Sequence, residues 1–253
     1  MSIGLTLKDP AFVGVAGAGG VSYPDGLGSA ADGTLTNIVL DTTNKKFGAA
    51  SYAFNTGGLP TSLVNIGVST QFPQGADNRS VSIWFRTGAT VFDPNEVFAW
   101  GNLGVTYNYV VGLYVNAGIF VSGYASPQWT TTSPYINYND DDWHSLITTL
   151  GSGVHKIYVD GSEIDSRAAA FNTGGGGTVK NATIGLEQPL GSEEWKGELD
   201  DMGIWDRVLT SGEASDIWDG GTGALANTID TTGMLAYYNF DTTTGGLINQ
   251  AIP

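Results

Sequence analysis

The segment Val154–Ile164 constrains the fold more than any other part of the sequence, because it places Asp160-Gly161 between two alternating runs of apolar and polar residues. An Asp-Gly pair tolerates the positive φ angles of the tight turns that join antiparallel strands, so this segment predicts a β-hairpin. Strand character recurs at Val81–Arg86 and at Trp143–Leu150. A chain with antiparallel strands at such short intervals belongs to the all-β class.

The composition supports many strands joined by turns. Of 253 residues, 37 are glycine, and hydrophobic residues make up 41% against 14% charged residues. Disordered chains show the opposite balance, whereas glycine together with Thr, Val, Tyr and Trp is typical of strands and tight turns. Only Thr210–Trp218 has helical signals, with Thr210 as N-cap, Glu213 three residues on, and Gly220 as a stop. One short helix is therefore predicted.

The net charge of −15, with only ten Lys and Arg residues, bears on the partners of this chain. The basic residues stand singly along the sequence, so we expect no basic face for nucleic acid. An acidic surface favours solubility and is also suited to recruiting Ca²⁺. No window has the length and apolar character of a membrane span, so we expect no membrane insertion, and the first residues lack the features of a secretion signal.

Several short segments follow one another in the order of the strands of one known fold. They are Lys46–Ala50, Ser82–Phe85, Asp142–His144, Ile157–Gly161, Thr183–Gly185 and Gly197–Leu209. Together they resemble the laminin-G-like jelly rolls of the concanavalin A-like lectin/glucanase superfamily, over roughly Asp25 to Gly220. The resemblance implies an all-β fold, a two-sheet antiparallel jelly-roll sandwich with one short helix, whose rim loops bind sugars or proteins.

The segment Met234–Asp241 departs from this family pattern. It reads like the strand with which such domains usually open, yet here it stands at the C-terminus, followed by Asn249–Ala251. Residues 235–240 are apolar on both alternating faces, so this strand needs cover. Either it closes the same sheet, which we expect, or it pairs with a neighbouring subunit. We therefore predict an extended arm over residues 1–24 and a jelly-roll domain over residues 25–253 that includes a C-terminal strand within 233–253.

The pair Asp200-Asp201 is the candidate calcium site. The resemblance implies that one member joins backbone carbonyls and an N-terminal Asp, here Asp25 or Asp32, to hold a structural Ca²⁺. Ca²⁺ prefers several oxygen ligands in a flexible geometry, which loop carbonyls and carboxylates supply. The alternative is that one Asp accepts hydrogen bonds from loop amides without a metal. Regular alternation sends the two side chains to opposite faces, so only one is expected to point inward.

The sequence offers little support for glycan cleavage. Jelly rolls that cut polysaccharides place two carboxylates across one strand, usually as Glu-x-Asp-x-x-Glu, and this motif does not occur. The carboxylates that stand together are Glu193-Glu194, Asp200-Asp201 and Asp140–Asp142. Adjacent residues point to opposite sides of an extended strand, so none of these forms an acid/base pair. We therefore expect a protein that is not an enzyme.

Aromatic rings in or near loops are the candidates for stacking on a sugar. They are Trp100, Tyr107, Tyr109, Tyr124 and Trp129. Packing in the core or at an interface is the alternative for each of these rings.

Taken together, these features favour a lectin-like structural or binding protein on the exterior of a virus or phage particle, as a capsid decoration, fibre or tail-attached domain. Its expected partners are other protein chains, in a homo-oligomer or particle, and surface glycans. The alternative is a secreted or cell-surface carbohydrate-binding module of a microbe. A glycan-cleaving enzyme remains a third alternative, which requires loop carboxylates to converge.

Overall fold

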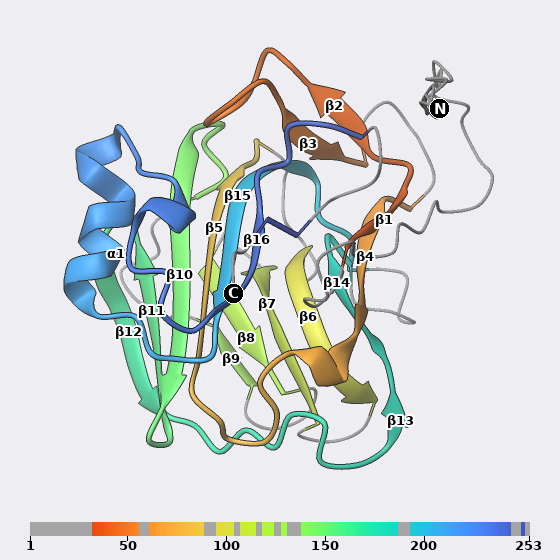
Figure 1. Cartoon of the computed structure of the whole chain (residues 1–253), viewed down its shortest axis with the longest axis vertical. Helices are drawn as coiled ribbons and strands as arrows, with labels where there is room; N and C mark the ends of the chain where they lie inside the picture. Colours follow the sequence, from red (N-terminus) through yellow and green to blue (C-terminus); the bar gives the residue numbers. More distant parts are fainter. Residues whose placement is uncertain are drawn as a thin grey trace, which may run out of the picture.

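The computed structural model describes residues 32–55, 61–88, 95–103, 107–114, 118–123, 128–130, 138–186, 193–243 and 249–250. Within them the chain forms two sheets packed face to face, and every ladder between named strands is antiparallel (Figure 1). The predicted all-β sandwich with one short helix is confirmed. The arm predicted over residues 1–24 lies outside the described residues.

Sheet I has eight strands, in the order β1-β4-β14-β6-β7-β8-β9, with β13 also paired to β6. Their bounds are β1 Thr34–Thr36, β4 Leu63–Val68, β14 Asn181–Ile184, β6 Asn95–Leu103, β7 Asn108–Tyr114, β8 Gly118–Ser122, β9 Gln128–Thr130 and β13 Thr178–Val179. Figure 1 shows β6 to β9 behind the strands of the second sheet.

Sheet II also has eight strands, in the order β12-β11-β10-β5-β15-β3-β2, with β16 also paired to β15. Their bounds are β12 Ser162–Ala168, β11 Val154–Val159, β10 Trp143–Gly151, β5 Arg79–Arg86, β15 Gly197–Trp205, β3 Ser51–Phe54, β2 Val39–Asp41 and β16 Met234–Tyr238. The strands predicted around β5 and β10 are confirmed. So is the hairpin, in which Asp160 has φ 51° and Gly161 has φ 74° between β11 and β12.

The helix α1 spans Ser211–Trp218, and short 3-10 turns span η1 Ser69–Gln71, η2 Asp219–Gly221 and η3 Ala226–Thr228. The predicted capping box is present, because the Thr210 hydroxyl accepts the Glu213 N–H while the Glu213 carboxylate accepts the Thr210 N–H. The stop comes one residue before Gly220, since Asp219 already adopts the left-handed conformation with φ 43°.

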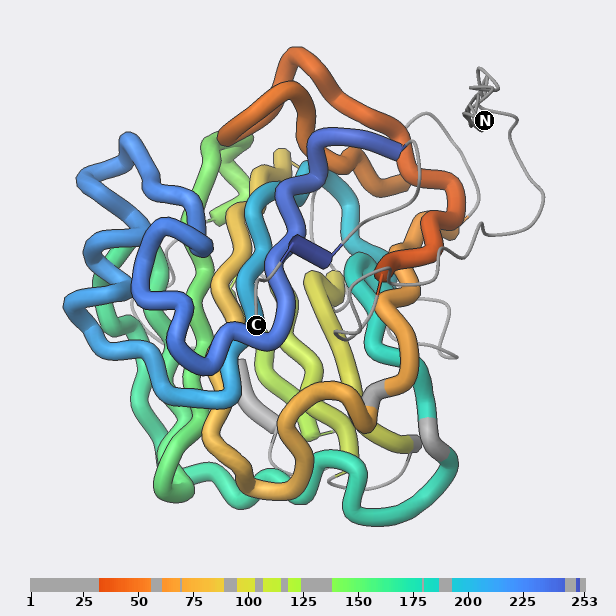
Figure 2. The backbone as a smooth tube through the Cα atoms, in the orientation of Figure 1, coloured from red at the N-terminus to blue at the C-terminus, as the bar shows by residue number. Residues whose placement is uncertain are grey.

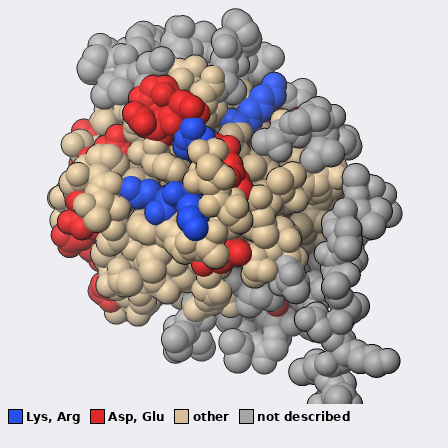
Figure 3. Space-filling view, turned by 90° about the horizontal axis from the view of Figure 1, so that it is seen from above, with Lys and Arg blue, Asp and Glu red and all other residues tan. Residues whose placement is uncertain are grey.

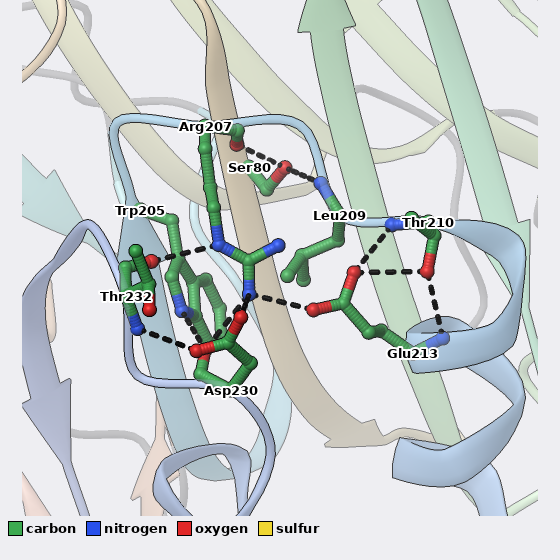
Figure 4. Close-up of polar contacts among 8 residues, drawn as sticks. All are labelled: Ser80, Trp205, Arg207, Leu209, Thr210, Glu213, Asp230 and Thr232. Carbon is green, nitrogen blue, oxygen red and sulfur yellow. Dashed lines mark hydrogen bonds and ion pairs between the residues drawn. The ribbon is translucent and has the colours of Figure 1, made fainter.

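Arg207 fixes α1 to sheet II (Figure 4). Its guanidinium donates to the Glu213 carboxylate at 2.6 Å and to the carbonyls of Thr232 and Asp230 at 2.7 and 2.8 Å. The Ser80 hydroxyl of β5 donates to the Arg207 carbonyl and accepts the Leu209 N–H. The start of the helix is therefore held by strand and loop together.

Sheet II is covered on both faces. Its inner face packs on sheet I in the main core, which includes Val81, Leu146 and Ile204. Its outer face carries a second apolar cluster, in which Trp84 and Trp205 pack with Ile217 of α1. The indole of Trp218 stacks on Trp84 with ring centroids 5.6 Å apart. Described elements thus make a third layer over this sheet.

The C-terminal strand closes sheet II within the same chain. β16 pairs antiparallel with β15, so the expected closure of the same sheet is the arrangement that the structure has. Both faces are covered, because Ala236 and Tyr238 lie in the main core while Met234 and Tyr237 lie in the outer cluster. Phe240 follows the strand with φ 53° and is fully buried.

Candidate functional site

Two of the aromatic residues predicted to stack on sugar lie inside the sandwich. Trp100 is 2% exposed and Tyr109 is fully buried, and their ring centroids are 4.8 Å apart. The Tyr109 hydroxyl lies 2.9 Å from Thr148 Oγ1 and 2.8 Å from His155 Nε2. For these two rings the structure shows the alternative, core packing, so a surface sugar does not reach them.

The other three candidates are placed less fully. Tyr107 is half-buried, and its ring lies against Gly176. Trp129 belongs to β9, although its side chain lies outside what the structure describes, and Tyr124 is outside the described residues altogether. A sugar-stacking role of these three residues stays a prediction.

The pair Asp200-Asp201 is buried beneath the outer layer of sheet II. Both side chains are 0% exposed. Asp200 Oδ2 accepts the N–H groups of Lys46 and Phe47, both at 2.9 Å. Asp200 Oδ1 accepts the Asp201 N–H at 2.9 Å.

Asp201 is satisfied in the same way by the outer layer. Its Oδ1 accepts the Tyr237 hydroxyl at 2.7 Å, and its Oδ2 accepts the Ala226 N–H at 2.9 Å. Each carboxylate oxygen of the pair therefore faces at least one N–H or O–H hydrogen.

The expectation that only one of these aspartates points inward is wrong, because a β-bulge interrupts the alternation. Asp200 pairs with Trp84 and Gly203 pairs with Ser82, so β15 has one extra residue at this point. Asp201 takes that position with φ 46°. A bulge keeps successive side chains on one side of the sheet. Both carboxylates consequently point to the outer layer and away from the core between the sheets.

The described members of the predicted calcium set do not fit a calcium site. Ca²⁺ needs oxygens that face the ion, whereas those of Asp200 and Asp201 face hydrogen-bond donors. Asp32 Oδ1 accepts the Asn249 N–H at 3.0 Å. Over the described ranges, no group of three or more His, Asp or Glu side chains has an arrangement suited to a metal. Asp25 lies outside the described residues.

Burial changes the proton affinity of the pair. Desolvation raises the pKa of Asp200 to about 8, against the opposing effect of the backbone N–H groups that it accepts. Desolvation likewise raises the pKa of Asp201 to about 7, although the Tyr237 hydroxyl opposes it. Both side chains are hydrogen-bonded to covered loops and fully buried, so no substrate reaches them.

The acidic run Asp140–Asp142 lies at one end of the sandwich, among side chains that engage it. His144 lies between two carboxylates, with Nδ1 2.8 Å from Asp160 Oδ2 and Nε2 3.1 Å from Asp140 Oδ1. Arg86 forms an ion pair of 2.7 Å with Asp141 and another of 3.1 Å with Glu198. The surface seen in Figure 3 carries both acidic groups and small basic groups near one another.

An open hollow of about 840 Å³ lies between the loop that precedes β5 and the β10–β11 turn. Figure 2 shows these two segments, in orange and green, side by side at the lower end of the molecule. The polar side chains that line it belong to Thr70, Gln71, Gln74, Asp77, Asn78, Ser152 and Asp206. No Lys or Arg is among its described lining residues. Such a surface offers hydroxyl, amide and carboxylate groups to a ligand rich in hydroxyls.

A second hollow of about 800 Å³ lies beside α1 and is lined by acidic residues that include Glu213, Asp216 and Asp230. Two of its carboxylates are engaged by Arg207, at 2.6 Å for Glu213 and 3.6 Å for Asp230 (Figure 4). This hollow therefore belongs to the anchor of the helix.

The sequence matches the family model of the concanavalin A-like lectin/glucanases superfamily over residues 57–215. The chain belongs to this superfamily. No curated protein matches the sequence.

Solved structures of the same fold include domains from very different proteins. Domain 4 of the extracellular arabinanase AbnA from Geobacillus stearothermophilus, in complex with arabinotriose, has a TM-score of 0.53 and 16% identity, over 73% of this chain and 86% of that one. The binding domain of botulinum neurotoxin serotype G has a TM-score of 0.55 and 15% identity, over 78% of this chain and 48% of that one. A Trypanosoma rangeli sialidase mutant that displays trans-sialidase activity has a TM-score of 0.55 and 15% identity, over 77% of this chain and 30% of that one.

These likenesses concern the fold of a concanavalin A-like domain. The chain spans less than half the length of the neurotoxin domain and of the sialidase that it resembles. Over the described residues, no helix combines the length and the apolar character needed to cross a bilayer.

The residues that line the polar hollow of this concanavalin A-like domain were not among the sequence-based candidates. Asp77 and Asn78 are exposed residues directly before β5, and Ser152 is exposed in the β10–β11 turn. Two sequence signals could have identified them. Asp77-Asn78 precedes an Arg that opens a buried strand, and Ser152-Gly153 separates two strand-like runs.

Proposed function

We propose that this chain is a non-enzymatic, lectin-like domain that binds glycans through the loops that border the polar hollow between η1 and the β10–β11 turn. The observation that carries the proposal is the lining of that hollow. Hydroxyl, amide and carboxylate side chains converge there from separate segments of the chain. Sugars are recognised by such convergent polar groups beside a limited apolar surface, which Leu235 supplies here.

The family adds support for glycan binding. The chain belongs to a superfamily of lectins and glucanases, and one solved domain of the same fold is in complex with arabinotriose. Because fold alone does not fix function, the argument depends on the hollow.

A catalytic role has less support, because the adjacent carboxylates are committed elsewhere. Asp200 and Asp201 are buried under hydrogen-bond donors, and Asp140 and Asp141 contact His144 and Arg86. Glycoside hydrolysis requires an accessible pair of carboxylates on either side of the scissile bond. Asp77 and Asp206 are the exposed carboxylates that line the hollow, so this alternative depends on them.

The direct test is binding of the purified protein to an array of neutral and anionic oligosaccharides, followed by calorimetric titration of the best ligands. We expect saturable binding to at least one glycan and no release of reducing ends on prolonged incubation. Absence of binding across the array rejects the lectin-like function. Release of reducing ends that is lost on mutation of one carboxylate rejects the non-enzymatic one.

We further propose an extracellular setting, for which the sequence favours the exterior of a virus or phage particle over a microbial cell surface. A particle component assembles with other copies or with other structural chains, whereas a free carbohydrate-binding module stays monomeric. Mass measurement by size-exclusion chromatography with light scattering separates the two settings. A monomer at high protein concentration rejects the homo-oligomeric particle component.

A further inference from the structure

Arg79 is a fully buried cation whose partners are neutral. It is 0% exposed, and no carboxylate of the described chain lies within ion-pair distance of it. Its guanidinium donates to the carbonyls of Asp77, Gln74 and Gly75, at 3.1, 3.3 and 2.8 Å, and to Thr173 Oγ1 at 2.9 Å. Burial of a charge without an ion-pair partner is costly, and the more distant carboxylate of Asp77 offsets only part of this cost. The hydrogen bonds of Arg79 therefore need an explanation.

Those bonds fix one loop from the inside. Three of the four acceptors are carbonyl groups of loop 72–78, between η1 and β5. Trp100 Nε1 donates to the Pro73 carbonyl at 3.1 Å, and Gly75 exchanges backbone hydrogen bonds with Thr173. The backbone of the loop is thus held by the core while Asp77 and Asn78 remain exposed on its outer side. Groups held in this way lose little further freedom when a ligand binds.

The facing wall of the hollow carries backbone strain. Ser152 has φ 50°, a left-handed conformation that Asn, Asp and Gly adopt readily and that Ser does not favour. The corresponding turn between β11 and β12 uses Asp160-Gly161, the preferred pair. Strained residues of this kind cluster at binding sites, where a particular side chain is needed. Asn78 lies close to this turn. Its Oδ1 is 3.2 Å from the point that a Cβ atom would occupy if Gly151 had a side chain.

We infer that loop 72–78, held by Arg79 and Trp100, and the Ser152 turn form the binding site for a neutral saccharide. This inference rests on the proposed function and assigns its site and ligand class. The exposed carboxylates of Asp77 and Asp206 accept hydrogen bonds from sugar hydroxyls, and Asn78 both donates and accepts. With two carboxylates and no described basic residue in its lining, the hollow disfavours sialylated, sulfated or uronate-containing ligands.

The first experiment compares variants of the full chain on its best ligand. Asp77→Ala and Asn78→Ala should each weaken affinity about tenfold, the loss of one good charge-assisted or amide contact. Asp142→Ala and Asn181→Ala are matched controls, because they remove exposed side chains of the same kinds that do not line the hollow. The controls should stay within about twofold of the wild type. All four variants alter exposed side chains, so we expect them to fold.

The second experiment tests the positioning role of the core residues. Trp100→Phe removes the N–H that holds Pro73 and keeps an aromatic ring in the core. We expect weaker binding with a less favourable binding entropy, because the loop must then be ordered by the ligand. The double variant with Trp100→Phe and Asn78→Ala should lose less affinity than the product of the two single fold-losses. A merely structural role of Trp100 leaves the two effects multiplicative.

The outcomes separate this inference from the proposed function. Failure of the wild type to bind any glycan ends both. Glycan binding that survives Asp77→Ala and Asn78→Ala at the level of the controls overturns the assigned site and leaves the lectin-like function standing. A preference of the wild type for anionic over neutral oligosaccharides overturns the ligand class.

Discussion

The side-chain oxygen of Asn249 accepts a hydrogen bond from the backbone N–H of Tyr237 at 2.9 Å, on the edge of β16 that faces away from β15. The Asn249 amide also donates to the Leu235 carbonyl at 3.2 Å, and the Gln250 N–H donates to the Tyr237 carbonyl at 2.8 Å. A side-chain amide and one backbone N–H thus take the place of a further strand. The edge is satisfied within the chain, which makes strand addition by a neighbouring subunit unfavourable here.

Asn249→Ala should lower the free energy of unfolding by about 1–3 kcal/mol, because it leaves a buried N–H and a carbonyl without partners. The measurement is urea denaturation followed by tryptophan fluorescence. Asn181→Ala, at an exposed position, is the control and should change little. A stability equal to that of the control contradicts a role of Asn249 at this edge.

His144 should make stability depend on pH. Burial lowers its pKa, but the carboxylates of Asp160 and Asp140 outweigh burial and raise the pKa above its ordinary 6.5. Because the folded-state pKa exceeds the unfolded one, this stabilisation is fully present below pH 6.5 and is lost as the pH rises through the folded-state pKa. His144→Gln should remove this component from unfolding curves between about pH 5 and pH 9. If the free energies of unfolding of the variant and the wild type differ by the same amount at every pH, His144 is not the source of the pH dependence.

The buried aspartates should add a second dependence of the same sign. The folded-state pKa values of about 8 for Asp200 and about 7 for Asp201 lie above the ordinary 3.8. The folded chain therefore keeps protons that the unfolded chain releases, and stability falls as the pH rises from about 4 to about 8. Asp201→Asn cannot ionise and should flatten this fall. Urea denaturation across this range checks this, and a fall at least as steep in the variant as in the wild type contradicts the raised pKa values.

Calcium should not stabilise the domain through Asp200-Asp201, because their oxygens already accept N–H and O–H donors. We expect the same melting temperature in calcium chloride and in EDTA. A higher melting temperature in calcium that Asp200→Asn abolishes shows instead that the pair rearranges to bind the ion. An increase that survives this variant places the ion elsewhere.

Ser152→Asn should stabilise the fold by up to about 1 kcal/mol, because Asn tolerates the left-handed conformation of the β10–β11 turn better than Ser. Thermal unfolding checks this, with Ser162→Asn in the exposed strand β12 as the control. A destabilised variant means that the Ser152 hydroxyl has a structural role that outweighs the backbone preference.

Local signals in the sequence predicted local structure well. The pair Asp160-Gly161 could adopt positive φ and therefore defined a hairpin and its register. Thr210 and Glu213 satisfied each other's backbone N–H groups and therefore defined the start of α1. In each case the determining contacts lie within a few residues of one another.

Long-range contacts set the features that the sequence did not reveal. Alternation places Trp100 and Tyr109 on faces of strands but does not say which face meets the other sheet. The extra residue at Asp201 breaks the alternation because Tyr237 and Ala226 supply partners on one side, and both lie more than twenty residues away. The polar hollow could not be predicted from the sequence for the same reason, since the segments that line it are brought together only in the folded sandwich.

The pairing of β15 with β3, β5 and β16 has a consequence for how the chain folds during synthesis. Until residues 197–205 have left the ribosome, β3 and β5 have no strand between them, and the centre of sheet II stays open. Contacts between segments so far apart in sequence give a high contact order, for which folding in milliseconds to seconds is usual. A nascent chain released before β15 should therefore be a target for chaperones or proteases, and the domain should acquire protease resistance only when its last fifth is complete.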